Sequence, residues 1–185
     1  MNKKHGFTLI ELLIVVMIIA ALTSVALPQY RRTIQRSEAT EAITNLRTIF
    51  EAAVRYRAEH SSSPTKVSQI DVGFYDAIEQ TAGQSDIGDF RYTFRDESIT
   101  VCRLKNSGTT WSVDNANTYC FTINYRPGVI APELNGLNSF NAGMGEILCW
   151  GHGKYQHVCP GFGNSIGHVT MTGGPTGGTD IFLLE

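Results

Sequence analysis

The sequence predicts an α+β fold in which one long N-terminal helix packs on a small antiparallel β-sheet. Residues 7–27 form an apolar run, and apolar side chains then recur at spacings of three and four as far as Val54. Several later segments are rich in β-branched and aromatic residues, which favour strands. Between Gly128 and Gly178 lie 13 of the 18 glycines, which indicates long loops toward the C-terminus.

The composition excludes several classes of protein. The 185 residues include 15 Lys and Arg against 17 Asp and Glu, so the net charge is -2. A nucleic-acid-binding domain is usually strongly basic, and this chain is not. A hydrophobic content of 42% with 18 Gly and 6 Pro is typical of a globular chain and not of a disordered or collagen-like one.

The apolar run begins directly after Gly6 and contains only four polar residues, one of which is Glu11. As a helix, residues 7–27 would be about 30 Å long, which is enough to cross the hydrocarbon core of a bilayer. A secretory signal peptide is the alternative, but the run is long and the sequence beyond Pro28 continues to favour a helix. A carboxylate near a membrane centre costs about 2.5–3.5 kcal/mol, so Glu11 needs a partner.

The stretch KKHGFTLIELLIVVMIIAALTSVALPQY resembles the prepilin leader and N-terminal helix of type IV pilins and of the pseudopilins of type II secretion. The resemblance joins Gly6, Phe7, Glu11 and Pro28 in one register. It implies that residues 1–6 are a leader, that a dedicated peptidase cuts between Gly6 and Phe7, and that Phe7 is then N-methylated. A proline at the position of Pro28 marks, in this family, a kink or a stretch that melts during assembly.

The predicted cleavage would give Glu11 a partner. Cutting after Gly6 creates an α-amino group at Phe7, and such amines titrate near 7.7–8. In a neighbouring subunit this cation can neutralise the carboxylate, so that two groups that are costly in an apolar environment satisfy each other. The expected partner is therefore another copy of the same chain.

Beyond Pro28, the chain predicts an amphipathic helix with one apolar face. We expect a single helix over residues 7–59, with a membrane-spanning part at about 7–27 and an amphipathic part that packs on a globular head. The apolar residues that share the face are Ala39, Ala42, Ile43, Leu46, Ile49, Phe50, Ala53 and Val54. The arginines expected to meet Glu38 or Glu41 of adjacent subunits are Arg31, Arg32 and Arg36.

The head is expected to occupy residues 60–185, because the segment HSSSP ends the helix. We expect an antiparallel sheet of three or four strands, one face of which packs on the apolar stripe of the helix. The segments that predict strands are 90–94, 99–104, 119–125 and, as a fourth, 145–150. Residues 73–89 suit a loop that admits a short helix at 75–80, residues from 128 onward suit long loops, and residues 180–185 suit a last edge strand.

The four cysteines, Cys102, Cys120, Cys149 and Cys159, allow three pairings, among which the sequence cannot choose. If the head lies outside the cytoplasm, as the resemblance implies, an even number of cysteines in a loop-rich domain indicates disulfides. We favour Cys102 with Cys120, which would join two neighbouring strands, and Cys149 with Cys159, which would close a loop.

Two metal sites are weighed and neither is expected. The zinc-capable set matches no standard zinc spacing and consists of Cys149, His152, His157 and Cys159. The acidic set lacks EF-hand order, is better explained as solvated surface and consists of Asp86, Asp89, Asp96 and Glu97. The chain has no G-x-S-x-G, P-loop or H-E-x-x-H motif, so we expect no enzyme and no cofactor.

The resemblance implies a subunit that is anchored in the bacterial inner membrane with its head in the periplasm. Prepilin peptidase and methyltransferase would process it, and the pilus assembly platform would extract it into an extracellular helical homopolymer. The expected function is the pilin of a type IV pilus, which serves adhesion, twitching motility or DNA uptake, with no nucleic acid required. A type II secretion pseudopilin is the alternative within the family, and a membrane-anchored enzyme or binding domain is the alternative outside it.

Overall fold

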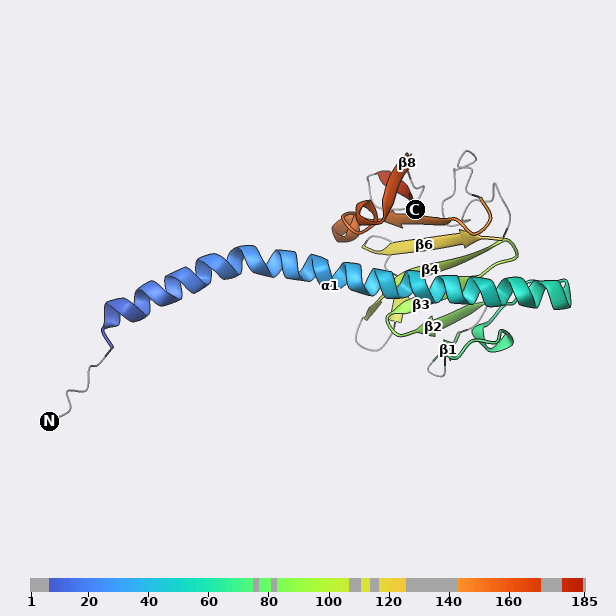
Figure 1. Ribbon diagram of the computed structural model, residues 1–185, viewed down its shortest axis with the longest axis horizontal. Coiled ribbons are helices and arrows are strands. Elements are labelled where there is room, and N and C mark those ends of the chain that lie inside the picture. The colour runs from blue at the N-terminus through green and yellow to red at the C-terminus, as the bar shows by residue number, and fades with distance from the viewer. Residues whose placement is uncertain are drawn as a thin grey trace. The chain divides into compact units, whose positions relative to one another are not determined.

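The computed structural model describes residues 7–74, 77–80, 83–106, 111–113, 117–125, 143–170 and 178–184. The chain divides into two compact units, Met1–Ser37 and Glu38–Glu185. The first unit contains the N-terminal part of helix α1 (Leu9–His60), and the second contains the rest of α1 and a β-sheet (Figure 1).

Helix α1 is continuous from Leu9 to His60, and Pro28 lies inside it. The helix ends where Ser61 adopts a positive φ of 54°, and the Ser61 amide donates to the carbonyl oxygen of Arg57 at 2.9 Å. A left-handed residue directly after the last turn is a common way to satisfy the free carbonyls of a helix end. The predicted helix over 7–59 is confirmed with small shifts at both ends.

Among the described residues, nine strands form one antiparallel sheet. Eight of them follow the order β1-β2-β3-β4-β6-β7-β9-β8, and β5 pairs with β4. The strands are β1 (Ile78–Glu79), β2 (Gln84–Ile87), β3 (Phe90–Phe94), β4 (Ser98–Asn106), β5 (Trp111–Val113), β6 (Tyr119–Asn124), β7 (Ile147–Gly151), β8 (Gly163–Thr170) and β9 (Gly178–Leu184). The described part of the chain also contains the short 3-10 helices η1 (Val67–Gln69), η2 (Gly153–Tyr155) and η3 (Cys159–Gly161).

Strands β3, β4, β6 and β7 coincide with the four predicted segments. The predicted number of strands, three or four, is wrong, because the described residues form nine. Residues 73–89 contain β1 and β2, so the predicted loop is wrong there. A helix at 75–80 is also wrong, because residues 78–79 are strand, while residues 75 and 76 lie outside the described part of the chain. The polar sequence of β2 has no apolar alternation, and the strand exists because it pairs with β3 along four residues.

The C-terminal prediction needs two further corrections. Strand β9 is not an edge strand, because β7 and β8 flank it. The flanking strand β8 lies in the region predicted as long loops. Glycine is depleted in strands, yet β8 begins with Gly163 and contains Gly167. The strand forms because its pairing with β9 outweighs the low strand propensity of these glycines.

In the second unit, α1 lies across one face of the sheet (Figure 1), and the hydrophobic core lies between them. The helix contributes Ala39, Ala42, Leu46, Ile49, Ala52 and Ala53. Alternate residues of β3, β4, β6 and β7 meet them, because successive side chains of a strand point to opposite faces. These include Phe90, Tyr92, Ile99, Val101, Phe121, Ile123 and Ile147. The predicted packing of an amphipathic helix on a sheet is confirmed.

Candidate functional site

Glu11 lies in the first turn of α1, where Thr8 holds its carboxylate. The Glu11 carboxylate oxygen Oε2 accepts hydrogen bonds from the Thr8 backbone amide at 2.8 Å and from the Thr8 hydroxyl at 2.7 Å. The Glu11 amide in turn donates to the Thr8 hydroxyl at 3.3 Å. This reciprocal arrangement is a capping box, which satisfies free amides at a helix start. The carboxylate is therefore ordered at the amino end of α1.

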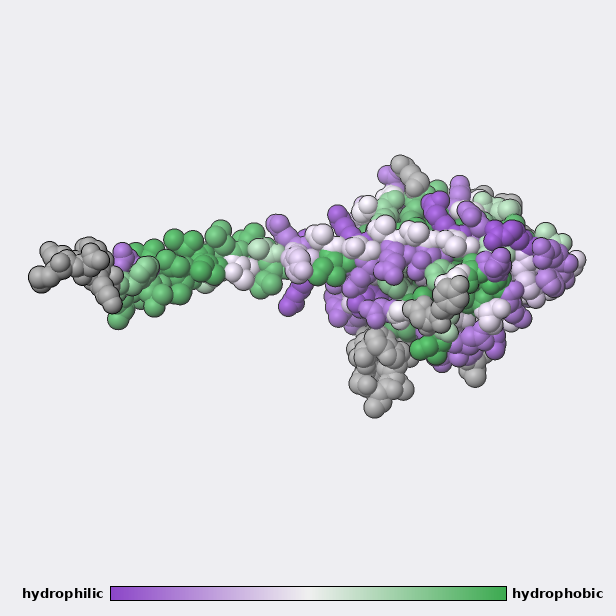
Figure 2. Space-filling model, turned by 60° about the horizontal axis from the view of Figure 1, so that its bottom comes forward, coloured by the Kyte–Doolittle hydropathy of each residue, from purple (hydrophilic) through white to green (hydrophobic). Residues whose placement is uncertain are grey.

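The first unit exposes a large apolar surface. Between Leu9 and Leu27, the large apolar side chains are 44–82% exposed. Figure 2 shows this surface as a continuous green region on the visible side of the N-terminal helix. Helix α1 is long and apolar enough to cross a membrane. A soluble monomer rarely exposes so large an apolar patch, so this surface requires a membrane or other subunits as its partner.

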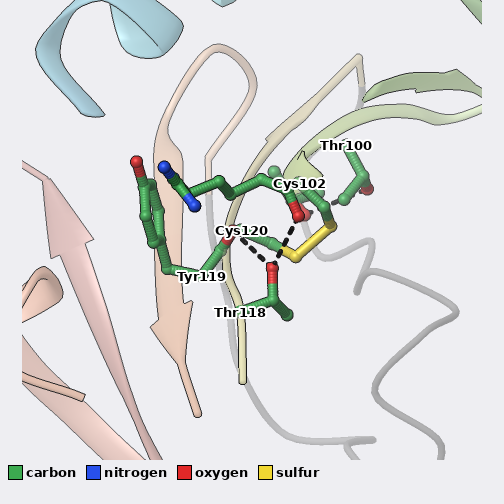
Figure 3. Close-up of a disulfide and its surroundings, with 7 residues drawn as sticks. Thr100, Cys102, Thr118, Tyr119 and Cys120 are labelled. Atoms are coloured by element: carbon green, nitrogen blue, oxygen red, sulfur yellow. Dashed lines mark hydrogen bonds between the residues drawn. A yellow bond between two sulfur atoms is a disulfide. The ribbon is translucent and has the colours of Figure 1, made fainter. Parts of the chain in front are cut away.

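The two disulfides follow the pairing that the sequence analysis favours. Cys102 in β4 bonds to Cys120 in β6, with 4.2 Å between their Cα atoms (Figure 3). Cys149 in β7 bonds to Cys159 in η3, with 5.6 Å between their Cα atoms. Within this disulfide, Cys149 and Cys159 have no thiolate to offer a metal, so the structure does not assemble the zinc-capable set.

His152, from the same zinc-capable set, is a core residue. Its side chain is 2% exposed, and its ring packs edge-on to Trp150 with the centroids 6.1 Å apart. Burial lowers the pKa of His152, because it disfavours the charged imidazolium. The imidazole is therefore held neutral inside the head.

Asp86 forms an ion pair with Arg91. Its Oδ1 and Oδ2 accept hydrogen bonds from Nε and Nη2 of Arg91 at 2.7 and 2.8 Å, and this pairing raises the pKa of Arg91. A bidentate guanidinium neutralises the carboxylate, so it does not act as a free ligand of an acidic cation site. Within the described ranges, no group of three or more His, Cys, Asp or Glu side chains is placed to hold a metal ion.

A polar cluster that the sequence analysis did not identify joins α1 to the sheet. It consists of Arg103, Glu38, Tyr155 and Tyr119, and we call it the Arg103 cluster. Arg103 donates from Nε to Glu38 Oε2 at 3.1 Å and from Nη1 to the Tyr155 hydroxyl at 2.9 Å. The Tyr155 ring packs edge-on to Tyr119 at 5.5 Å between centroids. The partners of Arg103 are 65 and 52 residues away in sequence, so no local pattern could reveal them.

The position of Glu38 bears on the predicted contacts with adjacent subunits. Glu38 and Glu41 were the two carboxylates expected to meet arginines of a neighbour. Glu38 has a partner within its own chain, Arg103. Glu41 is exposed and stays the candidate for an intermolecular pair.

Comparison with known proteins matches the start of the chain. The prokaryotic N-terminal methylation motif covers residues 1–27. A fimbrial protein of Pseudomonas aeruginosa is 40% identical over 92 residues, which are 47% of this chain and 60% of that protein. By this motif and these matched residues, the chain is similar to fimbrial proteins.

Two further relatives are named as a type IV pilin and a type IV fimbrial protein. The type IV major pilin protein PilA of Myxococcus xanthus is 42% identical over 57 residues, 31% of this chain and 26% of PilA. The type IV major fimbrial protein FimA of Dichelobacter nodosus is 46% identical over 56 residues, 29% of this chain and 36% of FimA. The chain spans 60% of the length of the Pseudomonas aeruginosa protein that it matches. No solved structure matches this chain.

The motif region includes Gly6, Phe7 and Glu11. Phe7 is 78% exposed and precedes the capping box, while Gly6 lies outside the described residues. Pro28 lies within α1, and its role as a kink or melting point stays a prediction. The structure thus shows Thr8 in contact with Glu11. Contacts of these residues with a second copy of the chain are a proposal.

Proposed function

We propose that this chain is the pilin of a type IV pilus, a structural subunit and not an enzyme, which polymerises into a helical surface filament. The observation that carries the proposal is the methylation motif at the start of an apolar helix whose side chains are exposed. The fimbrial names of the relatives support it. The filament would bury the apolar surface of residues 9–27 against the same surface of other copies, through a contact that repeats without closing.

Processing prepares the subunit for this contact. Residues 1–6 form the leader, prepilin peptidase cuts between Gly6 and Phe7, and the methyltransferase modifies the new amine of Phe7. The amine of one subunit pairs with the Glu11 carboxylate of its neighbour in the apolar core of the filament. The Thr8–Glu11 capping box supports this step, because it keeps the carboxylate ordered before the partner arrives.

Before assembly, residues 7–27 anchor the subunit in the inner membrane and residues 60–185 form a head in the periplasm. The two disulfides support that location, because disulfides persist in the oxidising periplasm and are rare in the cytosol. The pilus assembly platform then extracts the subunit. The filament serves adhesion, twitching motility or DNA uptake.

Electron microscopy of surface filaments tests the proposal, in cells with the gene, without it, and with the gene restored. We expect filaments to disappear on deletion and to return on restoration. Filaments that persist without the gene, together with a loss of protein secretion, would instead indicate a type II secretion pseudopilin.

A further inference from the structure

We propose that the Cys149–Cys159 disulfide acts on α1 at a distance, as a covalent clamp. It holds Tyr155 in place, Tyr155 holds the Arg103 cluster together, and the Arg103 cluster fastens residues 38–46 of α1 to the sheet. Opening this disulfide releases that part of the helix, whereas opening the other disulfide does not.

The first step is the tight segment between the two cysteines. Cys159 lies 10 positions after Cys149, and Tyr155 lies between them at the end of η2. The Tyr155 amide donates to the His152 carbonyl at 3.1 Å, and the Val158 amide donates to the Tyr155 carbonyl at 3.0 Å. The segment also lies close to β7, since a Cβ atom on Gly151 would be 2.8 Å from the Tyr155 carbonyl oxygen. The disulfide closes this segment and fixes where Tyr155 lies.

The second step is the contact of Tyr155 with Arg103. Tyr155 is 6% exposed, and its hydroxyl accepts the hydrogen bond from Arg103 Nη1 at 2.9 Å. The Arg103 guanidinium also lies 5.4 Å from the centre of the Tyr155 ring, within the range of a cation–π contact. Two interactions of the guanidinium therefore depend on the position of one side chain.

The third step is the dependence of residues 38–46 on Arg103. Arg103 Nε reaches Glu38 at 3.1 Å, at the start of the second unit. Before Leu46, the only fully buried side chains of α1 are, among the described residues, Ala39 and Ala42. Burial free energy is roughly proportional to apolar area, so Ala39, Ala42 and the partly buried Ile43 stabilise the segment less than Leu46 at its end and Ile49 beyond it. The Arg103 cluster therefore adds to what holds residues 38–45, the part of the segment before Leu46.

The other disulfide is a matched control within the same molecule. Cys102 is adjacent to Arg103 in β4, so its side chain points to the opposite face of the sheet. Cys102 and Cys120 are partners in a ladder that already pairs β4 with β6 over five residues. On that face, Thr100 and Thr122 share a hydrogen bond at 3.1 Å (Figure 3 labels Thr100 beside the disulfide). We therefore expect that removing the Cys102–Cys120 disulfide leaves Tyr155 in place.

Amide hydrogen exchange of the full chain in detergent micelles tests the clamp. We compare wild type, Cys149→Ala with Cys159→Ala, and Cys102→Ala with Cys120→Ala. We expect peptides over residues 38–46 to exchange about tenfold faster in the first double variant, and at the wild-type rate in the second. Equal acceleration in both double variants, or in neither, overturns the proposal.

A variant with both disulfides intact covers the case in which the first double variant unfolds throughout. Tyr155→Phe keeps the ring and removes only the hydroxyl that accepts the bond from Arg103. We expect exchange over residues 38–46 to rise by about threefold to tenfold, as the usual net contribution of one hydrogen bond predicts, with residues 47–58 unchanged. Wild-type exchange over 38–46 in Tyr155→Phe overturns the proposal whatever the cysteine variants do.

Discussion

Gly163 begins β8 at a point where no side chain fits. A Cβ atom there would overlap the Leu183 carbonyl oxygen in the neighbouring strand. We expect Gly163→Ala to destabilise the protein by about 1–3 kcal/mol, because strand backbones must shift to admit the methyl group. Urea denaturation followed by circular dichroism measures this change. The control is Ser165→Ala in the same strand, whose exposed side chain should change stability by less than about 0.5 kcal/mol. Equal effects of the two variants would contradict the steric argument.

His152 makes the head sensitive to mild acid. Burial lowers its pKa in the folded state, whereas in the unfolded chain the ring titrates near the ordinary value of about 6.5. As the pH falls below that value, the unfolded state takes up a proton that the folded state resists, so stability decreases. We expect the unfolding midpoint to drop between pH 7 and pH 5, and this dependence to be weaker in His152→Gln. The same slope in both proteins over this pH range would show that His152 is not the cause.

At the scale of an element, Glu11 has two roles at the start of α1: it caps the helix with Thr8, and it carries the charge proposed to pair with a neighbouring subunit. Two variants can separate these roles. Glu11→Gln removes the charge but keeps a side chain that completes a capping box with Thr8. Thr8→Ala removes the capping hydroxyl and keeps the charge. We expect Glu11→Gln to insert in the membrane and be cleaved, since the burial cost falls, but to assemble poorly because the amine of Phe7 loses its anion.

The counts of surface filaments per cell measure this difference. We expect Thr8→Ala to assemble far better than Glu11→Gln, because the loss of one cap costs only about 0.5–2 kcal/mol. Filaments of normal number and length from Glu11→Gln would refute the charge pairing between subunits.

How far the sequence predicts each element depends on where its stabilising contacts lie. Helix α1 and strands β3, β4 and β6 carry their own patterns of apolar and β-branched residues, so they could be predicted. Strand β2 could not, because its buried residues include Ser85 and Asp86. Ser85 accepts a hydrogen bond from the Val67 amide, and Asp86 pairs with Arg91, so both polar side chains are satisfied by partners on other elements. The order of β9 and β8 likewise depends on pairing and not on a local pattern.

At the scale of the whole molecule, the residues of the candidate site could be predicted where they are contiguous in sequence and could not where folding brings them together. The methylation motif is contiguous, so Gly6, Phe7 and Glu11 could be singled out from residue order alone. The Arg103 cluster assembles residues from α1, β4, β6 and η2, and only the folded chain brings them together. Long-range polar contacts of this kind are specified by topology, which single-sequence patterns do not encode.

The central claim is that this chain is processed after Gly6 and built into a surface filament. Mass spectrometry of filaments sheared from the cell surface tests it most directly, because one spectrum reports both the location of the chain and its N-terminus. We expect the sheared fraction to contain this chain, beginning at Phe7 with a methylated amine, lacking residues 1–6 and carrying two intramolecular disulfides. A chain that is absent from the filaments, or a mature protein that begins near Ala26 or later, would contradict the account.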